Sequence, residues 1–159
     1  MKTFELSGRL GEGKFAIVDD EDYERVIKNK WYWEGRYVIQ YLHPRDGSTI
    51  RLHRLILNAQ KGSIVDHINH NPLDNRKENL RFCTTKQNLW NRVVQKKAVT
   101  GLKGVAYDSR RKTYIAYITL NGKKTYLGYF KNKGLAAQAY NKAAMEHHGV
   151  FAYLNPVIL

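Results

Sequence analysis

Four side chains between residues 66 and 88 have the types that phosphodiester hydrolysis needs. Asp66 and His67 stand side by side, and two amides, Asn79 and Asn88, follow them. A histidine has an unperturbed pKa of about 6.5, so it can accept a proton from water near neutral pH. Carboxylate and amide oxygens are ligands that hard divalent cations prefer. This set predicts a hydrolytic site in which one metal ion offsets the phosphate charge and the histidine activates water.

The elements that must position these residues follow the order strand, loop, strand, helix. Residues 64–69 have the pattern of a short strand, and residues 71–79 are rich in Asn, Asp and Pro, which predicts an ordered loop. Residues 80–83 return as a second strand, and Thr84 or Thr85 then caps a helix through Arg92. The polar side chains of that helix are Gln87, Asn88, Asn91 and Arg92. We expect them to lie opposite the first strand.

Asp66 and His67 are neighbours in the first strand, and neighbours in a regular strand point to opposite faces. One solution is that His67 reaches across the hairpin while Asp66 points to the helix. The alternative interpretation has no chemistry: Asp66 and His67 cap a loop, and Asn88 is a solvated helix residue.

The run D-H-I-N-H-N-P-L-D-N-R-K-E-N-L-R, from Asp66 to Arg81, resembles the HNH endonucleases of phages and mobile introns, which have the ββα-metal fold. The resemblance implies that His67 is the general base, that Asp66 and Asn88 hold one divalent ion, and that Asn79 braces the loop. In that family the last motif position is often a second histidine, and here it is Asn88. Such an oxygen-rich site is expected to select Mg²⁺ or Mn²⁺ over Zn²⁺.

The composition is that of a globular protein with one ordinary domain or two small ones: 159 residues, 43% hydrophobic and 26% charged. No apolar run approaches the roughly 20 residues of a membrane span, and the N-terminus has no apolar signal region. Cys83 is the one cysteine, which favours a reducing, cytoplasmic location and a role as a small hydrophobic residue.

Positive charge is concentrated in the second half of the chain. Residues 1–91 carry 15 Lys or Arg and 12 Asp or Glu, a net charge of +3, whereas residues 92–159 carry 12 and two, a net charge of +10. Such a density favours a polyanionic partner, of which nucleic acid is the commonest. No amphipathic basic helix with a lipid-facing stripe supports a membrane partner instead.

Residues 1–62 precede the motif as a β-rich module. We expect strands at residues 15–18, 31–33, 36–41 and 49–53, a turn at residues 44–48, and a helix at residues 23–30 that the acids at 19–22 begin. His53 and Arg92 are candidate auxiliary residues of the site. His53 would either approach the scissile phosphate or serve a structural role.

Residues 101–159 form a second predicted domain, which a basic linker, residues 92–100, joins to the first domain, residues 1–91, with its nuclease core at 64–92. Strands are expected at residues 104–108, 114–120 and 123–130, with a hairpin turn at Asn121 and Gly122, then a helix at 135–147 ended by Gly149. The segments G-V-x-Y, Y-L-G-Y-F, A-A-x-A-Y-N-x-A-A and Y-L-N, with Tyr114, resemble the DNA-binding domain of plant ethylene-response (Apetala-type) factors. In that family the three-stranded sheet lies in the major groove.

Strand alternation places Tyr114, Ala116 and Ile118 on the helix side of this sheet, and Tyr117 and Thr119 on the other side. The resemblance implies DNA contacts at Lys103, Tyr117, Thr119, Lys124 and Tyr126. Positions that carry arginine in the family are Ala106 and Asp108 here, which leaves fewer groups for reading guanine. Arg110, Arg111 and Lys112 would compensate through phosphate contacts. The bland alternative is a solvated basic face.

These observations predict an α+β protein: a β-rich module with a ββα-metal nuclease motif, followed by a three-stranded antiparallel sheet packed on one helix. The predicted function is that of a site-directed, metal-dependent homing endonuclease of phage or mobile-element type. It would act on double-stranded DNA with one Mg²⁺ or Mn²⁺ ion, without a membrane, a small-molecule cofactor or a required oligomer. The alternatives are a non-catalytic DNA-binding regulator with an inactive HNH fold, and an RNA-binding protein.

Overall fold

The computed structural model describes residues 1–43, 46–94 and 98–156. The chain divides into two compact units, Met1–Thr85 and Lys86–Leu159. The elements of the first unit are β1 (Lys2–Glu5), β2 (Phe15–Val18), α1 (Asp20–Val26), β3 (Tyr32–Trp33), β4 (Val38–His43), β5 (Ser48–Arg51), α2 (Leu52–Ile56), β6 (Ile64–His67), the 3-10 turn η1 (Lys77–Asn79) and β7 (Leu80–Cys83). Within the described ranges, no helix has the length and apolar character needed to span a membrane.

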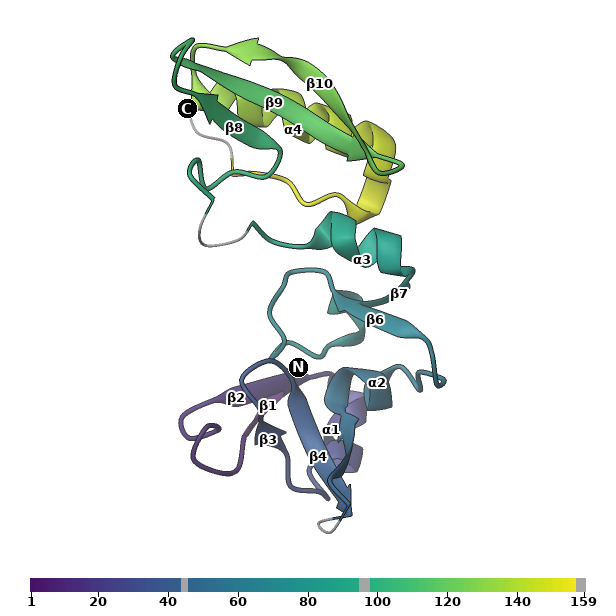
Figure 1. The fold of residues 1–159 in the computed structure, drawn as a ribbon. Helices are drawn as coiled ribbons and strands as arrows, with labels where there is room; N and C mark the ends of the chain where they lie inside the picture. Colours follow the sequence, from purple (N-terminus) through teal and green to yellow (C-terminus); the bar gives the residue numbers. More distant parts are fainter. Residues whose placement is uncertain (44–45, 95–97, 157–159) are drawn as a thin grey trace. The chain divides into compact units, whose positions relative to one another are not determined.

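The first unit is built from three small antiparallel sheets, β1–β2, β3–β4–β5 and β6–β7. Its core gathers fully buried side chains from several of these elements, including Val18, Val26, Trp31, Val38 and Leu52. The Trp31 indole Nε1 donates a hydrogen bond of 2.9 Å to the Val26 carbonyl, so burial leaves this polar group satisfied. Figure 1 traces these elements in purple and blue.

The strand β1 was not predicted from the sequence, and two further elements of this unit differ from the sequence-based prediction. The first helix spans Asp20–Val26, so it begins inside the acidic run instead of after it. The strand predicted at residues 49–53 ends at Arg51, and Leu52–Ile56 form the short helix α2. Leu52 and Ile56 are both buried and lie one helical turn apart, so the helix buries both on one face. The turn predicted at residues 44–48 includes Pro44 and Arg45, which are outside the described residues.

The nuclease motif folds as the hairpin β6–β7, with His67 paired to Leu80 and Asp66 paired to Arg81. The loop between the strands docks on β2 through backbone hydrogen bonds, from Ile17 N to the Leu73 carbonyl and from Asn75 N to the Ile17 carbonyl, both of 2.8 Å. The loop is therefore an integral part of the first unit.

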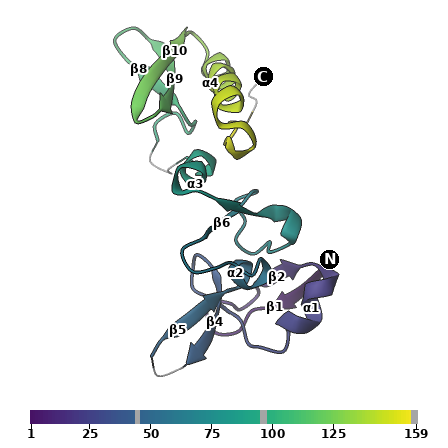
Figure 2. The ribbon, with the colours of Figure 1, turned by 90° about the vertical axis from the view of Figure 1, so that its right-hand side faces the viewer.

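The second unit contains α3 (Thr85–Asn91, from its second residue on), β8 (Val105–Asp108), β9 (Thr113–Leu120), β10 (Lys123–Phe130), α4 (Lys133–His148) and the 3-10 turn η2 (Gly149–Phe151). Figure 1 and Figure 2 show α4 lying along one face of the sheet β8–β9–β10. Small residues of α4 are buried against β9. Ala136 lies in one core cluster with Ala116, and Ala144 lies in another with Ile118. Of the basic linker predicted at residues 92–100, residues 95–97 lie outside the described residues.

Both ends of α4 follow from local chemistry. The Asn132 side chain caps the start by accepting a hydrogen bond of 2.6 Å from Gly134 N. Gly149 ends the helix with a positive φ of 54°, as predicted, because glycine adopts this conformation without steric cost. At the other end of the sheet, Gly104 lies so close to the Tyr140 ring that an added Cβ would approach it to 2.1 Å.

Candidate active site and nucleic-acid interface

The His67 side chain is buried in the first unit, with 6% of its surface exposed. Its Nε2 lies 3.4 Å from the Oδ1 of Asn75. The other amide atom of Asn75, Nδ2, donates to the Pro72 carbonyl, which fixes Oδ1 as the atom that faces the imidazole. With Nε2–H as the donor, the neutral His67 ring carries its lone pair on Nδ1. Burial lowers the pKa of His67, and this effect outweighs the opposing contributions of Asn75 and Asp66.

His53, which the sequence left between an auxiliary and a structural role, lies directly against His67. The two ring centroids are 5.0 Å apart with the rings edge to face. His53 is 3% exposed, and its ring also contacts Tyr37 at 5.2 Å. Burial lowers the pKa of His53 to about 3, with smaller contributions from His67 and the nearby arginines. His53 is therefore a neutral ring buried behind His67.

Asp66 points to a different partner. Its Oδ2 accepts hydrogen bonds from Arg81, of 3.1 Å from Nε and 2.9 Å from Nη2. Asp66 and Arg81 are directly paired across the hairpin, so their side chains share one face, while His67 shares the opposite face with Leu80. This arrangement agrees with the expectation that the two motif residues point apart.

Asp66 carries oxygen donors of the kind that hard divalent cations prefer. Among residues 1–43, 46–94 and 98–156, no group of three or more His, Cys, Asp or Glu side chains could enclose a metal. Magnesium is commonly held by one or two carboxylates, with water and phosphate oxygens completing its shell. Asp66 offers such a carboxylate, with Arg81 balancing its charge in the absence of an ion.

Asn79 connects the two ends of the loop. Its Oδ1 accepts a hydrogen bond of 2.9 Å from Asn69 N, and its Nδ2 donates one of 2.7 Å to the Asp74 carbonyl. The Asp74 carboxylate in turn accepts from Arg76 and from the Asn69 amide. The hydrogen bonds from Arg76 lower the pKa of Asp74, so this network stays charged at neutral pH. Asn79 thus has the geometry of a brace and not of a ligand.

The acidic run at residues 19–22 secures the same loop from outside. The Asp19 carboxylate accepts a hydrogen bond of 2.8 Å from Lys77 N, and the Lys77 ammonium pairs with Glu21 and Asp22. These contacts give the cluster of acids a structural role in holding the loop.

Asn88 is exposed on α3, and α3 belongs to the second unit from Lys86 onward. Asp66 and His67 belong to the first unit, whereas Asn88 belongs to the second. Arg92 follows α3, and its carbonyl accepts a hydrogen bond of 2.8 Å from the Lys103 ammonium.

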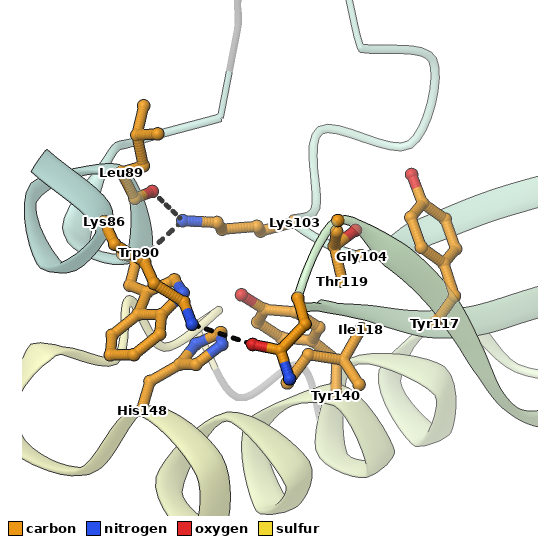
Figure 3. Close-up of a pocket in the computed structure, with 12 residues that line it drawn as sticks. Lys86, Leu89, Trp90, Lys103, Gly104, Tyr117, Ile118, Thr119, Tyr140 and His148 are labelled. Atoms are coloured by element: carbon orange, nitrogen blue, oxygen red, sulfur yellow. Dashed lines mark hydrogen bonds between the residues drawn. The ribbon is translucent and has the colours of Figure 1, made fainter.

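Lys103 binds the end of α3. Its Nζ donates to the carbonyls of Leu89, Trp90 and Arg92, at 3.3, 2.6 and 2.8 Å. A cation at this position satisfies terminal carbonyls and complements the negative end of the helix dipole. Burial lowers the pKa of Lys103 to about 8. This residue, which the Apetala-type resemblance assigns to DNA contact, therefore has its ammonium engaged inside the unit (Figure 3).

The four other residues of that assignment on the sheet do share its outer face. Tyr117 pairs with Tyr126 and Thr119 pairs with Lys124 across β9 and β10. The Lys124 ammonium lies 4.6 Å from the centroid of the Tyr117 ring. Tyr126 is 66% exposed, so this face is available to a ligand.

The basic turn between β8 and β9 projects from the same sheet. The Asp108 carboxylate accepts hydrogen bonds from the backbone N–H groups of Arg110 and Arg111, which fixes the turn. Lys112 completes it with a positive φ of 52°. The Arg111 guanidinium lies 4.8 Å from the centroid of the Tyr129 ring.

Sequence analysis missed Tyr129. In a regular strand Tyr126 and Tyr129 would point to opposite faces, but a bulge between Tyr126 and Gly128 pairs Tyr129 with Ile115 on the outer face. Gly128 inside the strand pattern was the available signal. Asn75 and Arg81, the partners of His67 and Asp66, were also missed, because only the hairpin register and the loop path bring them into contact.

Comparison with known proteins adds independent evidence. Residues 51–89 match a family model described as HNH endonuclease. The chain is 36% identical over 161 aligned residues to "Uncharacterized HNH endonuclease L560" of Acanthamoeba polyphaga mimivirus, covering 97% of this chain and 81% of the relative. It is also 35% identical over 95 residues to "Protein 3.8" of Escherichia phage T7, covering 58% of this chain and 75% of that protein. A match of this identity along nearly the whole chain, together with the hairpin that carries Asp66 and His67, shows that the protein belongs to the HNH endonuclease family of enzymes.

Proposed function

We propose that the protein is a metal-dependent DNA endonuclease of the homing type, in which His67 is the general base. The observation that carries this proposal is the orientation of the His67 ring. The Asn75 Oδ1 faces Nε2 of the ring at 3.4 Å, and with Nε2–H as the donor Nδ1 is the basic atom. A base must be held in one tautomer and one direction to take a proton from water.

Asp66 and Asn88 are proposed to hold the divalent ion that HNH nucleases typically use, with Mg²⁺ or Mn²⁺ as the metal. When bound, the ion would supply charge neutralisation at the phosphate and at the leaving oxygen. The assignment of Asp66 is supported by its carboxylate chemistry and by the sequence motif, and that of Asn88 by the sequence motif. Arg81 holds the Asp66 carboxylate in position through two hydrogen bonds.

His53 is proposed as a positioning residue that acts through His67. It is too deeply buried to reach a phosphate, and its ring packs edge to face on the His67 ring. Asn79 has a similar indirect role, since it joins the two ends of the loop that supplies Asn75.

The second unit is proposed to hold duplex DNA on the outer face of its sheet, as the Apetala-type resemblance implies. Tyr117, Thr119, Lys124 and Tyr126 share that face, and Tyr129 joins them through the bulge. The basic turn of Arg110, Arg111 and Lys112 would contact phosphates, which supply most of the salt-dependent affinity for DNA. Specificity and catalysis would then be divided between the units.

A plasmid-cleavage assay with and without Mg²⁺ tests the proposal. Wild-type protein should cut only with the metal, and His67→Ala should cut about 10²–10⁴ times more slowly because it lacks the general base. DNA binding by His67→Ala, measured by fluorescence anisotropy, should stay near that of the wild type.

His70→Ala is the matched control, since His70 follows the same strand but carries no assigned role. Cleavage by His67→Ala at the wild-type rate would contradict the assignment of the base. DNA binding by the wild type without any metal-dependent cleavage would favour the alternative function of a non-catalytic regulator.

A further inference from the structure

A pocket of about 430 Å³ lies within the second unit, between α3, the β9–β10 turn and α4. Figure 3 shows its walls: Leu89 and Trp90 come from α3, Ile118 from β9, and Tyr140 and His148 from α4. A volume of this size falls in the range that holds small planar ligands.

The pocket contains a polar side chain, His148, that the described part of the chain leaves unsatisfied. His148 is 6% exposed, and neither of its ring nitrogens has a hydrogen-bond partner among the residues that the structure describes. The Tyr140 side chain is 2% exposed, and its hydroxyl points into the pocket (Figure 3). Buried polar groups without partners are rare in native proteins and call for an explanation. A ligand that brings a donor and an acceptor would supply it.

Both groups are neutral at physiological pH. Burial lowers the pKa of His148, with the charge of Lys103 as the next contribution, and burial raises the pKa of the Tyr140 hydroxyl. A neutral imidazole offers one donor and one acceptor, and a phenol offers a donor. The hydrogen-bonding edge of a nucleobase carries both kinds of group.

The surroundings of the pocket favour an aromatic ligand attached to negative charge. The Trp90 ring is stacked on the His148 ring at 4.4 Å, and the Lys86 ammonium lies 5.3 Å from the Trp90 ring. Lys86 also donates a hydrogen bond of 2.9 Å to Asn121 at the rim. Residues 86–159 hold 13 Lys or Arg and two acids, which gives a net charge of +11.

The pocket is continuous with the proposed DNA-binding face. Tyr117 and Thr119 belong to that face and also line the pocket. A strand lying on the outer face of the sheet would therefore pass the rim, where Lys86 could exchange Asn121 for a phosphate.

We propose that this pocket receives one nucleobase of bound DNA, extruded from the base stack. The inference rests on the proposed function, since it requires DNA on the second unit. Extrusion costs least where a base is already unpaired, as in a bulge or a mismatch. Stacking on aromatic side chains recovers that cost, with an effect on affinity of roughly 5- to 150-fold per base.

The test compares two duplexes of the same sequence, fully paired or with one bulged 5-iodouracil, bound to the full-length chain without divalent metal. We expect the bulged duplex to bind roughly tenfold tighter, within the range expected for one stacked base. Ultraviolet irradiation should cross-link the iodouracil to Trp90, Tyr140 or His148, as mapped by mass spectrometry.

Tyr140→Phe and His148→Gln are the test variants, and Tyr126→Ala is the matched control on the outer face. Each test variant should reduce the preference for the bulge, whereas Tyr126→Ala should weaken both duplexes equally. Thermal unfolding verifies the fold of each variant. One folded test variant is enough to decide the proposal.

Cross-links confined to Tyr126 or Tyr129, which do not line the pocket, would overturn the proposal, as would a bulge preference unchanged in a folded test variant. Binding of deoxyadenosine monophosphate as tightly as the bulged duplex would also overturn it, because the pocket would then serve free nucleotides. Failure of the wild type to bind any DNA would instead refute the proposed function.

Discussion

His53 and His67 form a buried pair of neutral rings, and this pair makes the first unit sensitive to acid. The folded pKa of His53 is about 3, below its unfolded value near 6.5. Below pH 6.5 the unfolded chain binds a proton that the folded chain excludes, so stability falls as the pH falls toward 3. Burial shifts the pKa of His67 in the same direction.

His53→Phe should reduce this sensitivity, because phenylalanine keeps the ring contact without a titratable group. As the pH falls from 6.5 to 5, the unfolding free energy of both proteins should fall. The wild type should lose up to about 1.4 kcal/mol more per pH unit than the variant. Urea unfolding at several pH values measures the difference. Parallel pH dependences of the two proteins would show that His53 titrates normally.

The positioning role of His53 has a separate test. His53→Ala should lower kcat about ten- to a hundredfold with little change in KM, because the His67 ring would lose its packing partner. Leu52→Ala is the control: Leu52 is fully buried in the core on the same helix, so its loss destabilises the unit without removing the His53 ring from His67. Assays well below both melting temperatures separate the effects, and equal kcat losses would assign His53 a structural role alone.

Removing the charge of Asp66 tests the metal assignment. Asp66→Asn should raise the Mg²⁺ concentration for half-maximal cleavage, and Asn88→Ala should do so more mildly, because an amide is a weaker ligand than a carboxylate. Metal titrations of the cleavage rate measure both changes, with the exposed Glu146→Gln as a control. Cleavage that persists in excess chelator would exclude this mechanism.

At the scale of elements, local sequence patterns predicted the presence of helices and strands better than the residues at which they begin and end. The alternation of Tyr114 to Leu120, the turn at Asn121 and Gly122 and the glycine at 149 are local signals, and each was found in the structure. The short helix α2 was not predicted, and its first two residues were included in a strand, because five residues carry too little periodicity and burial of Leu52 and Ile56 decides their conformation.

The environment of the candidate site was only partly predictable. The residue types at positions 66, 67 and 79 indicated chemistry and an ordered loop. The pairing of Asp66 with Arg81 and the contact of His67 with Asn75 and His53 depend on tertiary packing, which no local pattern contains. Tyr129 was missed because one bulge reverses the alternation of the strand beyond it and brings the residue to the outer face.

The attachment of α3 through Lys103 gives a prediction at this scale. Lys103→Met keeps most of the apolar stem but leaves three carbonyls of α3 without the charged donor. The loss should cost about 1–3 kcal/mol in unfolding free energy and speed hydrogen exchange in α3. Urea unfolding and exchange mass spectrometry measure both effects, with the exposed turn residue Lys112→Met as the control. Unchanged exchange in α3 would show that Lys103 does not hold the helix.

At the scale of the whole molecule, charge and contacts divide the chain in the same place. A fragment of residues 86–159, which keeps α3, should fold and bind duplex DNA without metal. Contact with about six phosphates would lower its affinity roughly 10³-fold between 50 and 200 mM salt. Lys124→Ala should reduce the slope of log affinity against log salt by about one, while Tyr126→Ala should change the preference between sequences. Filter binding measures both.

The fragment of residues 1–85 provides the outcome that would contradict this prediction. Residues 1–85 should bind DNA weakly and without sequence preference, since they carry a net charge of only +2, from 14 Lys or Arg and 12 acids. Full affinity in this fragment, with none in residues 86–159, would reverse the division of labour.

The contacts of α3 also suit the enzyme to fragment complementation, in which two pieces of the chain reassemble into one folded protein. Val99 is 92% exposed, so a protease can reach the chain at this residue, which lies between α3 and Lys103. A nick there would separate α3 from the rest of the second unit in sequence, yet the Lys103 hydrogen bonds and the Trp90–His148 stack would still join the two pieces. A nicked enzyme would then co-elute as one species, and two separately expressed halves could reassemble as a split nuclease.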